Sequence, residues 1–130
     1  MTSRDIVIPV SWGELLDRLT ILEIKLARIA DPGKLAHVRL EWAALDAVRG
    51  ESLSPEVTDL ATRLRTVNEA LWDIEDAIRA HERAKDFGPA FIELARSVYR
   101  TNDFRSALKR EINQCMNSRL VEEKSYEPYD

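Results

Sequence analysis

The sequence predicts an all-α fold, an antiparallel helical bundle with one long central helix. Three observations support this prediction. Apolar residues recur every three or four positions along most of the 130 residues, which is the period of a buried helix face. Residues that start and stop helices flank each of these stretches. The connections between the stretches are short, so successive helices should run antiparallel.

The first predicted helix follows an extended N-terminal segment, residues 1–10. Ser11 is suited to cap the helix, and Glu14 stands three positions later, where a capping box places its acid. The helix should therefore begin at Trp12. The turn sequence "DPG", residues 31–33, should end it.

Two further helices follow, and the second of them should be the spine of the domain. One is predicted over residues 32–49, with Gly50 as its natural stop. The next should be capped by Ser54, and its apolar residues step by three and four as far as Ile78. It should end near Lys85, after about thirty residues and ~45 Å.

The last helical region is predicted between residues 89 and 117, inside a bundle that occupies residues 11–117 of a single domain, residues 1–130. Thr101 to Asp103 either cap a new helix or lie within one continuous helix, and the pattern is compatible with both. The residues expected to face inward in its second half are Phe104, Leu108, Ile112 and either Cys115 or Met116. Residues 118–130 lack a helical period, which predicts an extended C-terminal arm.

Composition and charge narrow the function classes. The net charge of −4 provides no overall basic field for phosphate backbones, so no nucleic-acid partner is predicted. One cysteine cannot form an internal disulfide, and the N-terminus lacks the pattern of a signal peptide. These features predict a cytoplasmic protein. No apolar run approaches the ~20 residues of a membrane span, so none is predicted.

The apolar stripes predict self-association. Two of them have the heptad spacing of a coiled coil, and together they offer more apolar surface than one small bundle needs. Trp12, Trp42 and Trp72 add to this surplus. Because apolar stripes must be covered, we expect a homodimer, and a further protein partner is compatible with the pattern.

An acidic row on the third helix has three interpretations. Glu69, Asp73 and Asp76 lie one turn apart on the face opposite the apolar seam, with Trp72 beside them. The row is a solvated helix face, a cation site, or an interface for the basic C-terminal region. We predict no metal site, and we hypothesise that the basic helix, from the same chain or from a dimer mate, covers Trp72 and faces the acids. Asp17 has no basic residue four positions later and could also reach the basic helix.

The densest candidate site is the stretch "YRTNDFRSALKR". Free backbone donors at a helix start, combined with arginines, suit a phosphate or carboxylate group. The candidate ligand-binding residues are Tyr99, Arg100, Asn102, Asp103, Arg105 and Lys109. The alternative is a capped helix with a charged outer face.

No catalytic motif is present in the sequence. It has no P-loop, GxGxxG or GxSxG, and neither His37 nor His81 has a second ligand at zinc spacing. Cys115 is expected to be a small buried core residue. We therefore predict no cofactor and no catalytic residue.

Four strings resemble a bacterial family of small uncharacterised all-helical proteins. They are "PVSWGELLDRLTILEIKLARI", "NEALWDIEDAIR", "FIELARSVYRTNDFRSALKREIN" and "SRLVEEKSY", and the resemblance covers roughly Ile6 to Tyr126. The family has no assigned activity, so the resemblance implies membership without a mechanism. The sequence thus favours an interaction or scaffold protein that acts through association. The alternative is a small helical enzyme or sensor with a ligand at the strip from Tyr99 to Arg110.

Overall fold

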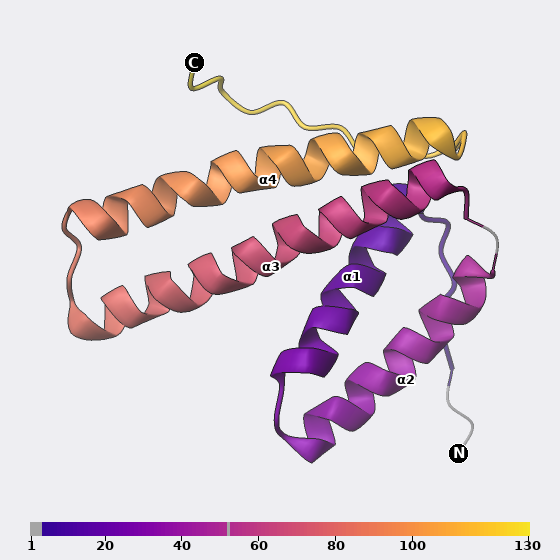
Figure 1. Ribbon diagram of the computed structural model, residues 1–130, viewed down its shortest axis with the longest axis horizontal. Helices are drawn as coiled ribbons and strands as arrows, with labels where there is room; N and C mark the ends of the chain where they lie inside the picture. The colour runs from indigo at the N-terminus through magenta and orange to yellow at the C-terminus, as the bar shows by residue number, and fades with distance from the viewer. Residues whose placement is uncertain (1–3, 52) are drawn as a thin grey trace.

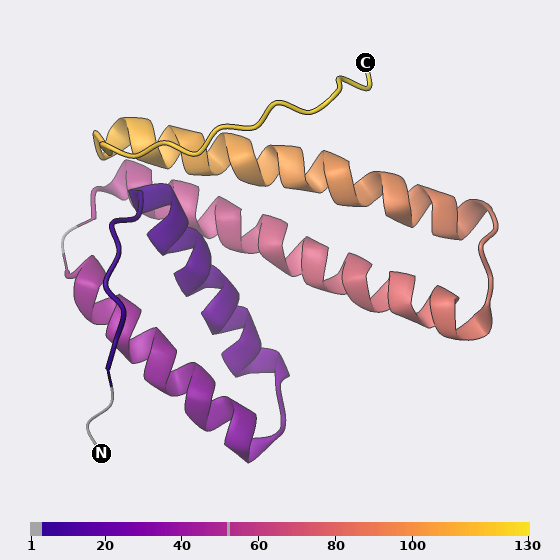
Figure 2. The same ribbon diagram turned by 180° about the vertical axis from the view of Figure 1, so that it is seen from behind.

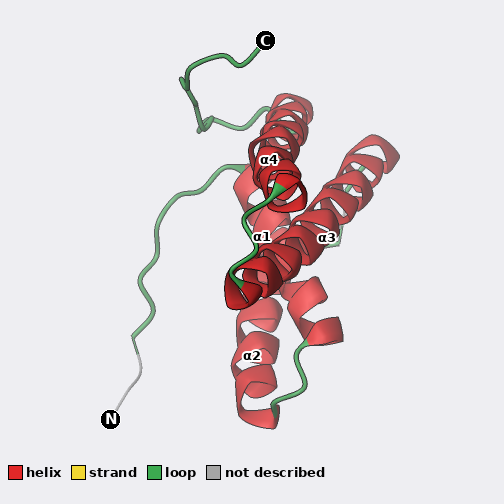
Figure 3. Cartoon of the chain, turned by 90° about the vertical axis from the view of Figure 1, so that its left-hand side faces the viewer, coloured by secondary structure: helices red, strands yellow, loops and turns green. Residues whose placement is uncertain are grey.

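The computed structural model describes residues 4–51 and 53–130, and these residues form four helices (Figure 1). The helices are α1 (Trp12–Arg28), α2 (Pro32–Arg49), α3 (Pro55–Ala84) and α4 (Pro89–Cys115). The described residues contain no strand, and the predicted all-α class is confirmed (Figure 3). Residues 1–3 of the predicted N-terminal segment and Ser52 of the predicted loop lie outside the described residues.

The predicted helix starts are confirmed, and those of α1, α2 and α3 have a side-chain cap. The Ser11 hydroxyl accepts a hydrogen bond from the backbone amide of Glu14, at 3.1 Å. The Ser54 hydroxyl does the same for the amide of Val57, at 3.2 Å. The carboxylate of Glu14 binds Arg18 and Lys109. These caps satisfy amides that have no partner inside the helix, and they explain why the boundaries follow from short stretches of sequence.

The four helices form two antiparallel hairpins that cross each other (Figures 1 and 2). In the second hairpin, α3 and α4 lie side by side along their whole length. In the first, α2 packs against α1, and α1 lies across the first half of α3 and the second half of α4. The remaining half of the α3–α4 hairpin extends beyond α1. We call this part, residues 69–104, the distal hairpin.

The core lies where α1 crosses the second hairpin. Its buried residues are Leu15, Leu16, Leu19, Val57, Leu60, Leu64, Leu108 and Ile112. Trp42 and Leu45 of α2 pack against the edge of this cluster. In the distal hairpin the apolar seam of α3 continues, but Leu71, Ile74 and Ile78 are only partly buried. The reason is that α1 ends beside Trp72 and Asp73, so it borders Leu71 only at a cavity and does not cover the seam beyond it.

The predicted inward face of α4 is partly wrong. Leu108 and Ile112 are buried as expected, but 67 % of the Phe104 surface is exposed and Cys115 is also exposed. Met116 takes the last inward position and packs against the core. The cause is that α4 has helices on only two of its sides, so a wide apolar stripe is covered only in its centre.

The structure answers the open question about Thr101 to Asp103 and shows how the chain continues after α4. Thr101 to Asp103 lie inside one continuous helix, α4. Asn117 follows with a φ of 51°, and the amide of Ser118 bonds to the carbonyl of Asn113 at 2.8 Å, which closes the helix end. Residues 118–130 then run back along α4 as an extended arm (Figure 2). We call them the C-terminal arm.

Among the described residues, no helix is both long and apolar enough to cross a bilayer.

Candidate functional site

All six predicted ligand-binding residues lie on α4, but they face different neighbours. Arg105 and Lys109 contact α1, and Tyr99 contacts the C-terminal arm. Asp103, Arg105 and Lys109 line three different cavities. The structure therefore assembles two separate contact regions from the strip.

The first region is a buried carboxylate, Asp17, at the centre of the helix crossing. Only 1 % of its surface is exposed. Arg105 holds both carboxylate oxygens, from Nε at 2.9 Å and from Nη2 at 2.5 Å. The amide nitrogen of Asn68 donates to Asp17 Oδ1 and to the Thr20 hydroxyl, each at 2.9 Å. The prediction that Asp17 reaches the basic helix is confirmed, and the network joins α1, α3 and α4.

The carboxylate of Asp17 is paired with Arg105 in this network, whereas the buried Asn68 Oδ1 has no hydrogen-bond partner. The hydrogen bond to Asp17 raises the pKa of Arg105, so the guanidinium stays charged beside the carboxylate. A buried ion pair with additional hydrogen bonds contributes mainly by fixing the relative placement of the elements that carry it. Arg105 therefore sets the register of α4 against α1, and its two carboxylate contacts occupy the donors that a ligand would use.

Lys109 joins the same crossing to the C-terminal arm. Its Nζ lies 2.8 Å from Glu14 Oε2 and 3.0 Å from Glu122 Oε2. Burial lowers the pKa of Lys109, but the hydrogen bonds to the two glutamates outweigh burial and the pKa lies above its usual value. Burial raises the pKa of Glu14, and here Lys109 and Arg18 outweigh it, so the Glu14 pKa lies below its usual value. Lys109 and Glu14 therefore both remain charged at neutral pH.

The start of α1 approaches the backbone of α4 closely at Gly13. Its amide donates to Asn113 Oδ1 at 2.7 Å, and a Cβ placed on Gly13 would lie 2.5 Å from the carbonyl oxygen of Lys109. Backbone atoms of a packed helix cannot move aside as the end of a flexible side chain can. Only glycine fits between the two helices at this point.

We therefore expect Gly13→Ala to lower the free energy of unfolding by about 1–3 kcal/mol, as overpacked cores do. Urea denaturation measures the change. Gly33→Ala is the matched control, because a Cβ there meets only the side chain of Asp31, at 3.3 Å, in the first turn of α2. Equal losses for the two variants would contradict the close approach of α1 and α4.

The second region is the contact between α4 and the C-terminal arm. Arg110 Nη2 lies 3.0 Å from Glu123 Oε2. The rings of Tyr99 and Tyr129 have centroids 5.0 Å apart, and the carboxylate of Asp103 raises the pKa of the Tyr129 hydroxyl. The arm thus lies over the exposed side of the predicted strip (Figure 2). Sequence analysis had identified both the arm and the strip but had not paired them.

The remaining two strip residues contact neighbours within α4. Arg100 Nη1 lies 3.2 Å from Glu93, and Asn102 Oδ1 accepts a hydrogen bond from Arg105 at 3.5 Å. The four cations Arg100, Arg105, Lys109 and Arg110 of this stretch each contact a carboxylate of the same chain.

The acidic row of α3 meets α1 and not the basic helix. Asp73 pairs with Arg28, whose guanidinium carbon lies 6.0 Å from the centroid of the Trp72 ring. The hydrogen bond to Asp73 raises the pKa of Arg28. Glu69 pairs with Arg65 on its own helix, at 2.9 Å. Within one chain, the last turn of α1 therefore lies beside Trp72 and pairs with Asp73. That the basic helix of a dimer mate covers Trp72 stays a prediction.

Trp72 still lies beside one residue of α4. A cavity of about 330 Å³ is lined by Trp72, Asp76, Arg105 and the apolar side chains Ile21 and Ile24 of α1. Asp76 stands at this cavity with Glu75, one turn from the α1 contact. Among the described residues, no group of three or more His, Cys, Asp or Glu side chains is placed to hold a metal ion.

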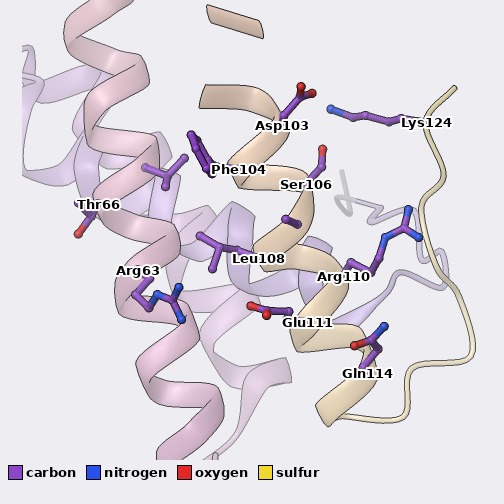
Figure 4. A pocket seen from close by; sticks show the side chains of 12 residues that line it. Arg63, Thr66, Asp103, Phe104, Ser106, Leu108, Arg110, Glu111, Gln114 and Lys124 are labelled. Carbon is purple, nitrogen blue, oxygen red and sulfur yellow. The ribbon is translucent and has the colours of Figure 1, made fainter. Parts of the chain in front are cut away.

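A concave feature with a volume of about 810 Å³ lies between α3, α4 and the C-terminal arm (Figure 4). We call it the α3/α4 groove. Its residues are Arg63, Thr66, Val67, Asp103, Phe104, Ser106, Ala107, Leu108, Arg110, Glu111, Gln114 and Lys124. Phe104 points toward α3 from one wall, on the side of α4 away from the arm (Figure 4). The groove has a mainly apolar lining and charged residues of both signs.

Sequence analysis missed this groove because it placed Phe104 in the core. The sequence feature that could have indicated the groove is the width of the apolar stripe on α4. This stripe is wider than two neighbouring helices can cover.

Comparison with known proteins places the chain in a family without supplying an activity. No curated protein and no solved structure matches the chain. A family of unknown function, DUF6165, has a model that matches residues 6–129, nearly the stretch over which the sequence resemblance was recognised. A function therefore has to be inferred from the fold, the buried network and the groove. The chain belongs to the family of unknown function DUF6165.

Proposed function

We propose that this protein is a helical interaction module that associates with a second copy of itself through the α3/α4 groove. The observation that carries the proposal is the groove with Phe104 at its wall. The exposed Phe104 side chain can act as a knob, and the apolar groove beside it can act as the hole that receives a knob from another chain. A second copy related by two-fold symmetry would place each Phe104 in the other groove.

The charges around the groove support a copy of the same chain as the occupant. Arg63, Arg110 and Lys124 stand with Asp103 and Glu111 around the cleft. A two-fold contact brings the same patch of both copies together, so a patch with both signs can pair each acid with a base of the other copy. A patch of one sign would repel itself.

The volume of the groove also supports a protein occupant. A cleft of about 810 Å³ with a mainly apolar lining is large enough for several side chains. Apolar surface of this kind is covered when it mediates association. In this proposal the protein acts in the cytoplasm as a scaffold, and the distal hairpins of both copies extend from the contact.

Ligand binding at the strip from Tyr99 to Arg110 stays a prediction. The four cations of the strip already contact carboxylates of the same chain, which favours association over ligand binding as the function.

Sedimentation velocity and light scattering after gel filtration test the proposal. We expect the wild-type mass to rise with concentration to that of a dimer, and Phe104→Ser to remain a monomer at the same concentrations. Leu40→Ser is the matched control, because Leu40 is 74 % exposed on α2 and should leave the dimer intact. A wild-type protein that stays monomeric, or a Phe104→Ser protein that still dimerises, would contradict the proposal.

Charge reversal tests the orientation of the two copies. Arg63→Glu and Glu111→Arg should each weaken the dimer, because like charges then meet across the contact. An equimolar mixture of the two variants should restore it, because both contacts become attractive again.

A further inference from the structure

We infer that the exposed side of α4 is a docking surface for an extended acidic protein segment, and that the C-terminal arm is its resident occupant. The partner segment would carry two adjacent carboxylates followed by an aromatic residue six positions later. The arm has this pattern in Glu122, Glu123 and Tyr129.

The contacts of the arm define what the surface recognises. At one end, Lys109 and Arg110 bind the two adjacent glutamates, at 3.0 Å each. At the other end, Tyr99 contacts the Tyr129 ring, with Asp103 beside the Tyr129 hydroxyl. Charge recognition and aromatic recognition are therefore separated along the helix, which a single small anion could not satisfy.

The lengths of the two elements match. From Arg110 back to Tyr99 the helix advances about 16 Å, at ~1.5 Å per residue. From Glu123 to Tyr129 an extended chain advances about 20 Å, at ~3.3 Å per residue. An extended segment can thus reach both ends of the surface at once, and a helical segment with the same residues would be too short.

The charge of the arm complements the surface. Residues 118–130 contain four acidic residues, Glu122, Glu123, Glu127 and Asp130, and two basic ones. The arm lies on a helix stretch that presents Lys109 and Arg110. A cavity of only about 30 Å³ remains between the arm and this part of α4, so the occupant already fits closely there.

The arm is attached in a way that permits exchange. Glu123 is exposed and its partner Arg110 is half-exposed, and exposed ion pairs contribute only about 0–1 kcal/mol each. The arm holds its place chiefly because it belongs to the same chain, which gives it a millimolar effective concentration. A partner segment with the same pattern would compete for the surface.

This inference does not rest on self-association through the α3/α4 groove. The two surfaces share Arg110 and Asp103, but their tests change different residues. The groove test uses Phe104, which points toward α3 (Figure 4), whereas the docking test opens the surface at Glu122 and Glu123 of the arm. Either proposal can therefore fail while the other holds.

The test measures binding of a fluorescein-labelled peptide with the sequence of residues 118–130, by fluorescence anisotropy. The protein is the full chain with Glu122→Lys and Glu123→Lys, which should release the arm. We expect this opened protein to bind the peptide at least about tenfold more tightly than the wild type, whose own arm competes. The single variant Glu123→Lys provides a milder opening, because Glu123 is an exposed residue whose salt bridge is to Arg110.

A charge exchange shows whether the peptide binds at this surface. In the opened protein, Arg110→Glu should abolish peptide binding, and a peptide with Glu123→Arg should restore it. Arg79→Glu is the matched control, because Arg79 pairs with Glu75 on the exposed side of α3 and should leave binding unchanged. Absence of binding to both opened proteins, equal binding to opened and wild-type protein, or binding that survives Arg110→Glu would each overturn the inference.

Discussion

Asp17→Ala should lower the free energy of unfolding by about 3–5 kcal/mol, the largest effect we expect of any single substitution of a charged residue. The substitution leaves the Arg105 guanidinium at the helix crossing without the carboxylate that it contacts through two nitrogens. It also removes the acceptor of one Asn68 amide hydrogen bond. A charge without a counter-charge in a partly buried site is more costly than the loss of the pair itself.

Urea denaturation followed by circular dichroism measures this effect. Asp73→Ala is the matched control, because its carboxylate also pairs with an arginine of another helix but is 66 % exposed. The control should change stability by only about 0–1 kcal/mol. A double variant, Asp17→Ala with Arg105→Met, should recover part of the loss, since it no longer holds an unpaired charge. Similar losses for Asp17→Ala and Asp73→Ala would show that the buried network does not hold the crossing together.

Leu64→Ala should cost about 2–5 kcal/mol, whereas Ile78→Ala should cost clearly less. Both residues lie on the same apolar seam of α3, two heptads apart. Leu64 is completely buried under α1, and Ile78 is only partly buried in the distal hairpin. Leu64→Ala therefore leaves a cavity in the core. Ile78→Ala mainly removes apolar side-chain surface that is already partly exposed to water.

The two positions are compared by thermal unfolding of both variants at one low protein concentration. Unfolding is followed by the circular dichroism of the backbone amides. The low concentration keeps the comparison within single chains. Equal shifts in Tm would mean that the distal hairpin is as well packed as the helix crossing, which would contradict the distribution of burial described above.

The helix boundaries were predictable because their causes are local. Ser11 and Ser54 cap amides three residues ahead, and Pro55 and Pro89 suit the first turn of a helix. The same reasoning could not decide whether Thr101 to Asp103 interrupt the last helix, because such residues are compatible with a cap and with a helix interior. In the structure α4 continues through this stretch as one helix packed along α3.

The residue types of the candidate site were also predictable, but their neighbours were not. Arg105 and Lys109 were predicted to bind a ligand, and that stays a prediction, whereas in the structure both contact carboxylates. Sequence analysis could not show that these carboxylates belong to Asp17, Glu14 and Glu122 of the same chain. The expected inward position of Phe104 was wrong for a related reason, since periodicity gives the direction of a stripe and not the number of helices that cover it.

The sequence by itself therefore determined where each helix begins and ends, which residues form the centre of the core, and which chemistry the polar surface of α4 offers. These depend on interactions within a few residues of each position. Only the tertiary structure decided that α1 crosses at Gly13, that Asp17 meets Arg105, and that the C-terminal arm lies on α4. The first two contacts join residues 100 and 88 positions apart in the chain, and the arm contacts join residues 13 to 30 positions apart. Their geometry follows from how whole helices and the arm pack together.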